Sequence, residues 1–434
     1  MIKAIRGTKD ILPGESGIWQ EMEKVSRDNL KLFGYQEIRT PIIEDTSLFV
    51  KNIGEETDIV SKQMFSFVDR GERNISLRPE GTASVIRSYI ENNLDKISQF
   101  QKLYYIGPMF RAERPQAGRL RQFHQIGVEA IGSRHPALDA EVIALSAKLL
   151  DTAGIKGYKI KLNNLGCRED KKQLSKMLKE IFLNRKGEHL CEDCKRRIKM
   201  NPLRVLDCKN DGCREVVRKT FKEAVFICGA CKTHFEGVLK FIDMLNIKYE
   251  IDPYIVRGLD YYTRTVFEIT HEGLGSKDAI GAGGRYDNLS LDMEGPDVGA
   301  CGFALGMDRM IMTLDKGKAS GGADIFIATI GDAAYAKAFG MLSDLRNNGI
   351  SCEIDYEKKS LKAQMRGADS IEAKFVLIIG EDEIVKGEAA LRDMKTKEQT
   401  SIKFENVVKE IACLVGRQAS ALPSTSLGTS RASQ

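Results

Sequence analysis

Apolar positions near the start of the chain recur first at the spacing of a helix and then at that of a strand. The helical spacing predicts a helix through Ile18 that stops at Gly34. Residues 35–44 alternate between apolar and polar like a strand, with Pro41 marking an edge or a bend. A second amphipathic helix is predicted at 139–153.

Strand patterns in the first two thirds of the chain are separated by a segment of different character. Strands are predicted at 103–113, 121–131 and 263–270, and a glycine-rich region follows at 273–306. Residues 165–250 are instead helical, basic and rich in cysteine. We interpret this segment as an insertion between two halves of one catalytic domain.

The pattern changes again after a linker-like stretch at 316–323. Short apolar strands at 324–330 and 375–380 alternate with helices, which predicts a small α/β domain with a largely parallel sheet. The Ser-, Ala- and Thr-rich end of the chain is predicted to be disordered. We therefore expect a catalytic domain at 1–322 interrupted by the insertion at 165–250, an α/β domain at 323–417 and a tail at 418–434.

Composition is that of an ordinary globular protein. The 434 residues are 42% hydrophobic and 29% charged, which suits two or three domains with ample apolar material for their cores. No apolar run approaches the roughly 20 residues that span a bilayer, and the first residues are too charged for a signal peptide. We expect a cytoplasmic protein with no membrane partner.

The net charge of +5 is unevenly distributed. Between Arg168 and Lys222 there are 17 Lys and Arg against 9 Asp and Glu, so the rest of the chain is slightly acidic. A basic block of this kind suits contact with a polyanion. A solvated helical face explains the block equally well.

The most informative segment is 109–129, which is predicted to form a hairpin with Arg111 and Glu113 on one face of its first strand. Odd positions of the second strand continue that face, whereas even positions look like core and make His124 an unsuitable catalyst. The odd positions are Arg121, Phe123, Gln125, Gly127 and Glu129. Such a face can hold a phosphate, stack a base and offer a separate acidic pocket. The alternative is a surface hairpin with salt bridges.

Other segments add candidate chemistry. Glu80 lies beside a turn, where its carboxylate could receive an amino group. The segment 257–262 places Arg257 before a glycine and two tyrosines. Glycine clusters at 281–287 and 302–309 permit close approach of the backbone to a ligand, although neither follows the dinucleotide or P-loop spacing.

Together these segments resemble the class II aminoacyl-tRNA synthetases, and specifically the histidyl-tRNA synthetase family. The strand ending near Pro41 resembles motif 1 of that class, residues 110–123 resemble motif 2, and the segment ending in Arg309 resembles motif 3. The segments 257–262 and 283–287 resemble the two signatures that separate the histidine enzymes from the rest of the class.

The resemblance covers about residues 1–416 and implies an α/β fold with an α+β catalytic domain. That domain would have an antiparallel sheet flanked by helices and a helical insertion, followed by a C-terminal α/β anticodon-binding domain. The resemblance implies a homodimer through motif 1, and ATP with Mg²⁺. L-Histidine and ATP would form histidyl-adenylate and pyrophosphate, and the terminal adenosine of tRNA(His) would then take the histidyl group.

The resemblance also implies roles for individual residues. Arg111 and Arg257 would lie near the α-phosphate and Arg309 near the γ-phosphate, where fixed positive charge stabilises the reacting phosphorus. The histidine site would comprise Glu80, Thr82, Gln125, Glu129, Arg257, Tyr261 and Tyr262, with Gly127 leaving room for the ring. ATP would contact Arg111, Glu113, Arg119, Phe123 and Arg309, and the tRNA acceptor end would contact Gln116 and Arg121.

Seven of the ten cysteines lie between Cys167 and Cys231. Cys191, Cys194, Cys208 and Cys213, with a second C-x-x-C pair at 228–231, could build a tetrahedral structural Zn²⁺ site. Zinc is not a general feature of the family that the chain resembles. Buried reduced thiols are the alternative.

Two competing functions belong to other classes. A catalytically inactive paralogue, the regulatory subunit of ATP phosphoribosyltransferase, shares the catalytic fold but typically loses parts of the arginine signature and the anticodon domain, which this chain retains. A protein that only binds RNA would leave Glu80 and Glu129 unexplained.

Overall fold

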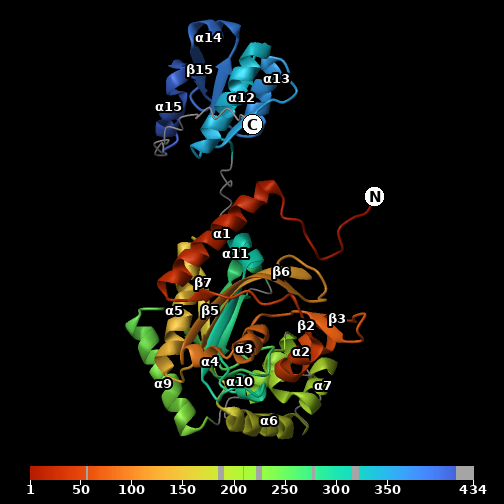
Figure 1. Cartoon of the computed structure of the whole chain (residues 1–434). Helices are drawn as coiled ribbons and strands as arrows, with labels where there is room; N and C mark the ends of the chain where they lie inside the picture. The colour runs from red at the N-terminus through yellow and green to blue at the C-terminus, as the bar shows by residue number, and fades with distance from the viewer. Residues whose placement is uncertain are drawn as a thin grey trace, which may run out of the picture. The chain divides into compact units, whose positions relative to one another are not determined.

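The computed structural model describes residues 1–54, 57–183, 190–208, 210–220, 227–275, 279–314 and 322–416. The chain divides into two compact units, residues 1–318 and 319–434 (Figure 1). Among the helices of the described ranges, none combines the length and the apolar character that a membrane crossing requires.

An eight-stranded sheet forms the centre of the first unit. Its inner strands pair antiparallel, and the two edge strands pair parallel with their neighbours. In spatial order the strands are β1 (Gln36–Glu37), β5 (Gln101–Phe110), β6 (Gln122–Ile131), β11 (Ala300–Gly306), β10 (Ala279–Arg285), β9 (Thr263–His271), β7 (Tyr158–Asn164) and β8 (Glu250–Ile251).

One face of this sheet is covered by helices α1 (Pro13–Leu32), α5 (Pro136–Thr152), α9 (Gly229–Met244) and α11 (Met307–Thr313). Helices α5 and α9 lie side by side (Figure 1). Ile126, Val128 and Ala130 of β6 are fully buried in this core, which confirms that the even positions of the strand face inward. Helix α9 belongs to the expected insertion by sequence, yet it packs with Val238 and Ile242 in the main core.

The opposite face of the sheet packs against α3 (Thr82–Glu91) and the insertion helices α6 (Arg168–Leu183), α7 (Glu192–Met200) and α8 (Asp211–Thr220). A three-stranded sheet stands beside it, in the order β2 (Ile43–Asp45), β4 (Asn74–Leu77), β3 (Phe65–Val68). Short helices complete the unit: α2 (Thr46–Ile53), η1 (Ile59–Gln63), α4 (Leu94–Ile97), η3 (Pro202–Val205), η5 (Glu272–Leu274) and α10 (Leu289–Asp292).

Two of the predicted strands differ from the structure. The single strand predicted at 35–44 is wrong, because Pro41 separates β1 from β2 and the two strands join different sheets. Strand β5 ends at Phe110, so Arg111 and Glu113 lie beyond the strand that was expected to reach residue 113. The chain leaves the ladder there because the Ala112 amide donates to the carbonyl of Gln63.

The second unit is an α/β domain, as predicted, with a five-stranded sheet. Strands β13 (Cys352–Ile354), β12 (Ile325–Thr329) and β14 (Phe375–Ile379) are parallel, whereas β15 (Glu388–Asp393) and β16 (Gln399–Lys403) extend the sheet antiparallel. The prediction of a largely parallel sheet therefore holds for three strands only. The helices are α12 (Asp332–Asn347), α13 (Leu361–Ser370), α14 (Glu381–Lys386), η6 (Phe404–Asn406) and α15 (Val407–Leu414). The tail predicted at 418–434 lies outside the described residues.

Candidate active site

A buried carboxylate on β6 is the centre of the site. Glu129 is only 1% exposed, and Thr82 at the start of α3 donates a hydrogen bond of 2.7 Å to its Oε1. The Tyr286 hydroxyl donates to Oε2. Burial raises the pKa of Glu129 to about 8, because removing a carboxylate from water favours its neutral form.

A second buried carboxylate, Glu80, lies two residues before the first residue of α3. Its two oxygens accept the backbone N–H groups of Thr82 and Ala83 at 2.6 and 2.9 Å, so Glu80 caps the start of that helix. Burial raises the pKa of Glu80 as well. Because Thr82 contacts both carboxylates, Glu80 and Glu129 belong to one hydrogen-bonded network.

Three tyrosines surround these carboxylates. The rings of Tyr261 and Tyr262 lie 4.8 Å apart, and that of Tyr261 lies 5.7 Å from the ring of Tyr286. The Tyr261 hydroxyl lies 3.5 Å from the nearer oxygen of Glu80. The segment 257–262 and the 281–287 segment therefore meet at the acidic pocket, although they are separate in sequence.

Tyr105 occupies the space beside Gly127 that was expected to receive the histidine ring. Gly127 pairs directly with Tyr105 across β5 and β6, and a Cβ at Gly127 would lie 2.1 Å from the Tyr105 ring. A Cβ at Gly81 would meet the same ring at 2.2 Å. The absence of side chains at both glycines thus makes room for Tyr105, which corrects the role expected for Gly127.

The motif 2 arginines lie beside the acidic pocket. The Arg111 guanidinium lies 5.3 Å from the centre of the Phe123 ring, and its Nε donates to the Pro79 carbonyl at 2.9 Å. Arg119 forms an ion pair of 2.7 Å with Glu113. Burial lowers the pKa of Arg111. The negative charges of Glu113 and Glu80 oppose that shift, so these two carboxylates interact electrostatically with Arg111.

Arg257, in the segment before β9, and Arg309, in helix α11, contribute two further guanidinium groups to the site. Arg257 forms an ion pair of 2.6 Å with Glu268 of β9. Arg309, at the start of α11, donates to the Gly118 carbonyl at 2.9 Å and to the carbonyl of Ala279.

The arginines converge on one region. Burial lowers the pKa of Arg309, and the positive charges of Arg119 and Arg111 lower it further. The negative charge of Glu268 instead raises the pKa of Arg309. Glu268, the ion-pair partner of Arg257, therefore interacts with Arg309 as well.

Several buried polar atoms of the site have no hydrogen-bond partner within the described ranges. They are Oε1 of Gln125, Nε of Arg257 and the hydroxyl of Tyr105. A buried polar atom without a partner costs about 1–3 kcal/mol, so these atoms offer positions for a polar ligand.

The residues expected to meet tRNA lie on the loop between β5 and β6. Gln116 is exposed, and its backbone pairs with that of Arg119 to close the loop. Arg121 is half-buried and donates from Nε to the carbonyl of Glu113 at 3.3 Å. His124 contacts Trp19 of α1 edge-on, and its backbone N–H donates to Asp308 of α11. Its even position puts its side chain on the face of β6 opposite to Glu129.

Sequence reasoning missed three side chains of the site: Tyr105, Glu268 and Tyr286. Tyr286 stands inside the glycine-rich signature at 283–287, which was recognised without assigning its tyrosine. Its neighbour Arg285 is fully buried on the opposite side, where Nε donates to Asp139 of α5 at 3.1 Å. Alternation along β10 could have separated these two roles.

The four cysteines predicted to bind zinc are brought together. The Sγ atoms of Cys191, Cys194, Cys208 and Cys213 lie within 4.8 Å of one another, and all four thiols are free. Cys191 precedes α7 and Cys194 lies in its first turn, while Cys208 and Cys213 flank the start of α8. Four sulfurs at this separation can surround one tetrahedral ion.

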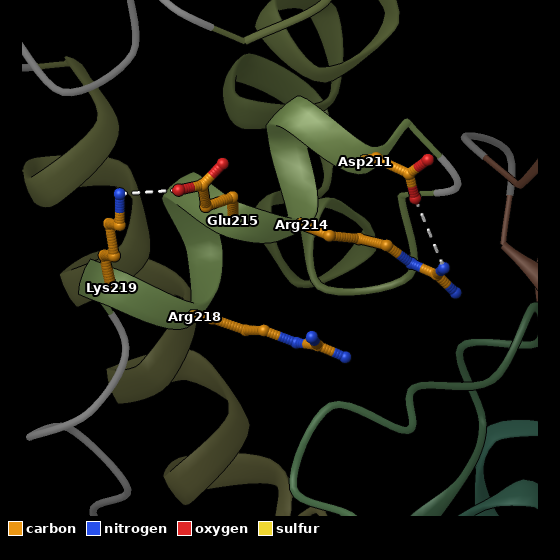
Figure 2. A pocket seen from close by; sticks show the side chains of 5 residues that line it. All are labelled: Asp211, Arg214, Glu215, Arg218 and Lys219. Atoms are coloured by element: carbon orange, nitrogen blue, oxygen red, sulfur yellow. Dashed lines mark ion pairs between the residues drawn. The ribbon is translucent and has the colours of Figure 1, made fainter.

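Much of the positive charge on the insertion is paired within its own helices. Figure 2 shows Lys219 of α8 directed toward Glu215 and Arg214 toward Asp211, with N–O distances of 2.6 and 3.8 Å. Arg218 is exposed and extends away from these pairs (Figure 2). The insertion thus combines a solvated, ion-paired face with some cations that are available to a polyanion.

Known proteins match both units of the chain. Residues 7–310 match the family described as Histidyl-tRNA synthetase, and residues 324–414 match the Anticodon binding domain. The histidine–tRNA ligase of Halothermothrix orenii is 47% identical over 95% of this chain and 100% of the relative.

Solved structures give the same result. The apo histidyl-tRNA synthetase of S. aureus has a TM-score of 0.78 and 37% identity, over 95% of this chain and 100% of that chain. A Bacillus halodurans protein described as an ATP phosphoribosyltransferase regulatory subunit/histidyl-tRNA synthetase has a TM-score of 0.65 and 22% identity. The similarity covers 88% of this chain and 98% of that chain. The second similarity is one of fold alone.

Proposed function

This chain belongs to the histidyl-tRNA synthetase family and attaches histidine to tRNA with ATP, and we propose that the site described above carries out that reaction. The observation that carries the assignment is the buried Glu129 network beside the converging arginines. An acidic pocket suits an imidazole and an amino group, and arginines suit phosphates. The inactive paralogue is less supported, because the relatives that match nearly the whole chain at high identity are histidine–tRNA ligases.

The arginines perform the first chemical step. The histidine carboxylate attacks the α-phosphorus of ATP, the bond to the bridging oxygen breaks, and pyrophosphate leaves. Arg111 and Arg257 would hold the carboxylate and the α-phosphate together, and Arg309 would hold the γ-phosphate, so their charges oppose the repulsion between two anions. Mg²⁺ bound with ATP would supply further positive charge to the phosphates. Phe123, held against Arg111, would stack on adenine, and Arg119 with its partner Glu113 would border the nucleotide.

The acidic pocket selects histidine. Glu129 and Tyr262 would bind the two imidazole nitrogens, whereas Glu80 would hold the α-amino group. Thr82, Gln125 and Tyr261, which also lie in the pocket, would supply the remaining polar contacts. An amino acid without two ring nitrogens would leave buried polar groups unpaired, at a cost of about 1–3 kcal/mol each.

The tRNA contacts extend beyond the active site. Gln116 and Arg121 on the β5–β6 loop would meet the acceptor end, from which the terminal hydroxyl attacks the adenylate carbonyl and releases AMP. The cations of the insertion would add contacts to the phosphate backbone. The second unit, which matches the anticodon-binding family, would read the anticodon of tRNA(His).

A homodimer would cover exposed apolar side chains near motif 1. Ile42, Ile43, Phe67 and Val68 are between 41% and 63% exposed on the segment after β1 and on the small sheet. Such a group of large apolar side chains favours an interface. We expect light scattering to give twice the chain mass, and the double substitution Ile43→Asp with Phe67→Asp to give the monomer. A monomeric wild type would contradict the dimer.

The first cysteine group would bind one structural Zn²⁺. Cys191, Cys194, Cys208 and Cys213 fill all four positions of a tetrahedron, which leaves none open for catalysis. The ion would join α7 to α8 within the insertion. Loss of Zn²⁺ on Cys194→Ser with Cys213→Ser is the expected result, and an unchanged metal content would reject this site.

Histidine-dependent exchange of pyrophosphate into ATP tests the proposed site. We expect exchange with histidine, none with the other amino acids at comparable concentration, and charging of tRNA(His) in a second assay. Loss of exchange on Arg111→Ala, and a raised KM for histidine in the exchange reaction of Glu129→Ala, would support the residue assignments. Wild-type exchange by both variants would show that the reaction occurs elsewhere.

A further inference from the structure

A second group of metal-binding side chains lies at the base of the insertion. One ligand atom each from Cys167, Asp170, Cys228 and Cys231 lies within 4.8 Å of the others. The cysteine pair at 228–231 was predicted to join the other cysteines, and the structure corrects this. The pair joins Cys167 and Asp170, so the cysteine-rich segment contains two groups of four ligands.

Two helix starts supply these four ligands. Cys167 precedes α6 and Asp170 lies in its first turn, whereas Cys228 precedes α9 and Cys231 lies in its first turn. A spacing of three residues across a helix start brings both side chains to one side. The two pairs come from segments far apart in sequence, so their meeting is a property of the fold. The backbone N–H groups of Cys167 and Cys228 both donate to Asp170, at 3.1 and 3.2 Å.

The Asp170 carboxylate is buried among thiols, with no basic partner in the part of the chain that the structure describes. It is 2% exposed, and among the described residues no Lys or Arg forms an ion pair with it. The basic residues nearest in sequence bond elsewhere. Lys171 donates to the backbone carbonyls of Asp260 and Tyr262, Arg168 pairs with Asp292, and Lys172 pairs with Glu169. Hydrogen bonds stabilise this buried charge, and a cation held by the four ligands would add the countercharge.

We propose that Cys167, Asp170, Cys228 and Cys231 bind one Zn²⁺ that closes the insertion at its base. The three thiols each lose a proton to solvent and bind as thiolates, and the carboxylate completes the tetrahedron. The four ligand charges exceed that of the ion by two, as in other sites with four anionic ligands. All positions belong to the protein, so the ion is structural.

The position of this ion connects it to the signature segment 257–262. Lys171, next to the ligand Asp170, donates from Nζ to the carbonyls of Asp260 and Tyr262 at 2.7 and 2.8 Å. The Asn164 side chain donates to the carbonyl of Cys231 at 3.0 Å. The ion therefore positions the segment that carries Tyr262. This part of the inference rests on the proposed histidine site, whereas binding of the ion does not.

Metal content of the purified full-length chain, loaded with Zn²⁺ alone and freed of excess, tests the site. We expect two ions per chain in the wild type and one after Cys228→Ser with Cys231→Ser. Cys413→Ser is the matched control, because this exposed thiol belongs to the second unit, and it should retain the full content. An unchanged metal content in the Cys228 and Cys231 variant would overturn the proposal, whatever the content of the first group.

Substitution of Asp170 separates metal binding from helix capping. Asp170→Ala and Asp170→Cys both remove the carboxylate that accepts the two N–H groups, but only cysteine can replace it as a ligand. We expect Asp170→Ala to lose one Zn²⁺ and Asp170→Cys to retain it. With Co²⁺ in place of Zn²⁺, Asp170→Cys should show stronger thiolate charge-transfer absorption than the wild type. Equal metal content in the two variants would overturn the role of Asp170 as a ligand.

The positioning effect is measured on the same variants. Loss of the ion at this site should raise the KM for histidine more than the KM for ATP, because the Tyr262 segment loses its support. Asp170→Cys should restore the KM for histidine. A variant that has lost the ion and keeps a wild-type KM for histidine would refute the positioning role.

Discussion

The acidic and basic ends of the active site are constructed differently. At the acidic end, Glu80 and Glu129 are buried, and their oxygens already accept hydrogen bonds from the protein. At the basic end, the Arg257 side chain is 20% exposed, and the Arg111 guanidinium donates hydrogen bonds within the described ranges from Nε only. The carboxylates thus accept hydrogen bonds from the protein before substrate binds. The guanidinium groups are held in place by some of their N–H donors, and the other donors can bind a substrate.

This difference indicates which end of the site determines the specificity for histidine and which end determines the reaction rate. An incoming imidazole has to replace existing hydrogen bonds at Glu129, so a ring that pairs imperfectly is rejected. Phosphates instead meet donors that backbone carbonyls have already fixed in place, which favours the transition state without reorganisation. We therefore expect substitutions at the acidic end to affect histidine binding and those at the basic end to affect the rate.

The largest effect is expected from Arg257→Ala. Loss of a fixed donor at the developing charge should lower the rate of adenylate formation by about 10²–10³-fold, while tRNA binding stays near that of the wild type. Pyrophosphate exchange and filter binding measure the two properties. Arg134→Ala, which removes an exposed ion pair with Asp297, is the control. Retained exchange in Arg257→Ala would remove Arg257 from the catalytic set.

A smaller change, confined to histidine, is expected from Glu129→Ala. Thr82 and Tyr286 lose their acceptor and the imidazole loses its partner, so the KM for histidine should rise about 10- to 100-fold. The KM for ATP should stay unchanged. Equal increases in both constants would mean that the two ends of the site are not separate. The exposed Glu91→Gln serves as the control.

Gly127→Ala tests the packing that supports the acidic end. The new Cβ would lie 2.1 Å from the Tyr105 ring, and overpacking of this kind costs about 1–3 kcal/mol of the free energy of unfolding. Gly340→Ala in α12 meets no atom within 4 Å and should be neutral or slightly stabilising. Thermal unfolding compares the two variants. A wild-type melting temperature for Gly127→Ala would show that Tyr105 moves aside freely.

The smallest expected change, taken for a single pH unit, is in the pH dependence of stability. The native state keeps the proton of Glu129 up to about pH 8, whereas the unfolded chain releases it near 4.5. Between these values the native state binds more protons, so the free energy of unfolding falls as pH rises, by up to about 1.4 kcal/mol per unit. Glu129→Gln should flatten this slope in ligand-free protein. A slope unaffected by Glu129→Gln would show that this carboxyl is ionised throughout.

The sequence predicted positions that depend on local alternation. The odd face of β6, with Phe123, Gln125 and Glu129, and the core face with Ile126 and Val128 follow from a period of two. The order of helices and strands follows in the same way. These features require no knowledge of which segments meet.

Contacts between segments that are distant in the chain could not be predicted from the sequence. Tyr105 fills the space at Gly127 because β5 and β6 pair in one particular register. Tyr286 reaches Glu129 across 157 positions of chain, and Cys228 joins Asp170 across 58. Spacing alone could not divide seven clustered cysteines into two groups, because that division depends on where α6 and α9 begin.

Calorimetric titration of histidine without ATP tests the division of the site most directly. We expect Arg309→Ala to bind histidine with an affinity near that of the wild type and Glu129→Ala to lose most of that affinity. The opposite result, in which Arg309→Ala abolishes histidine binding and Glu129→Ala retains it, would contradict the account.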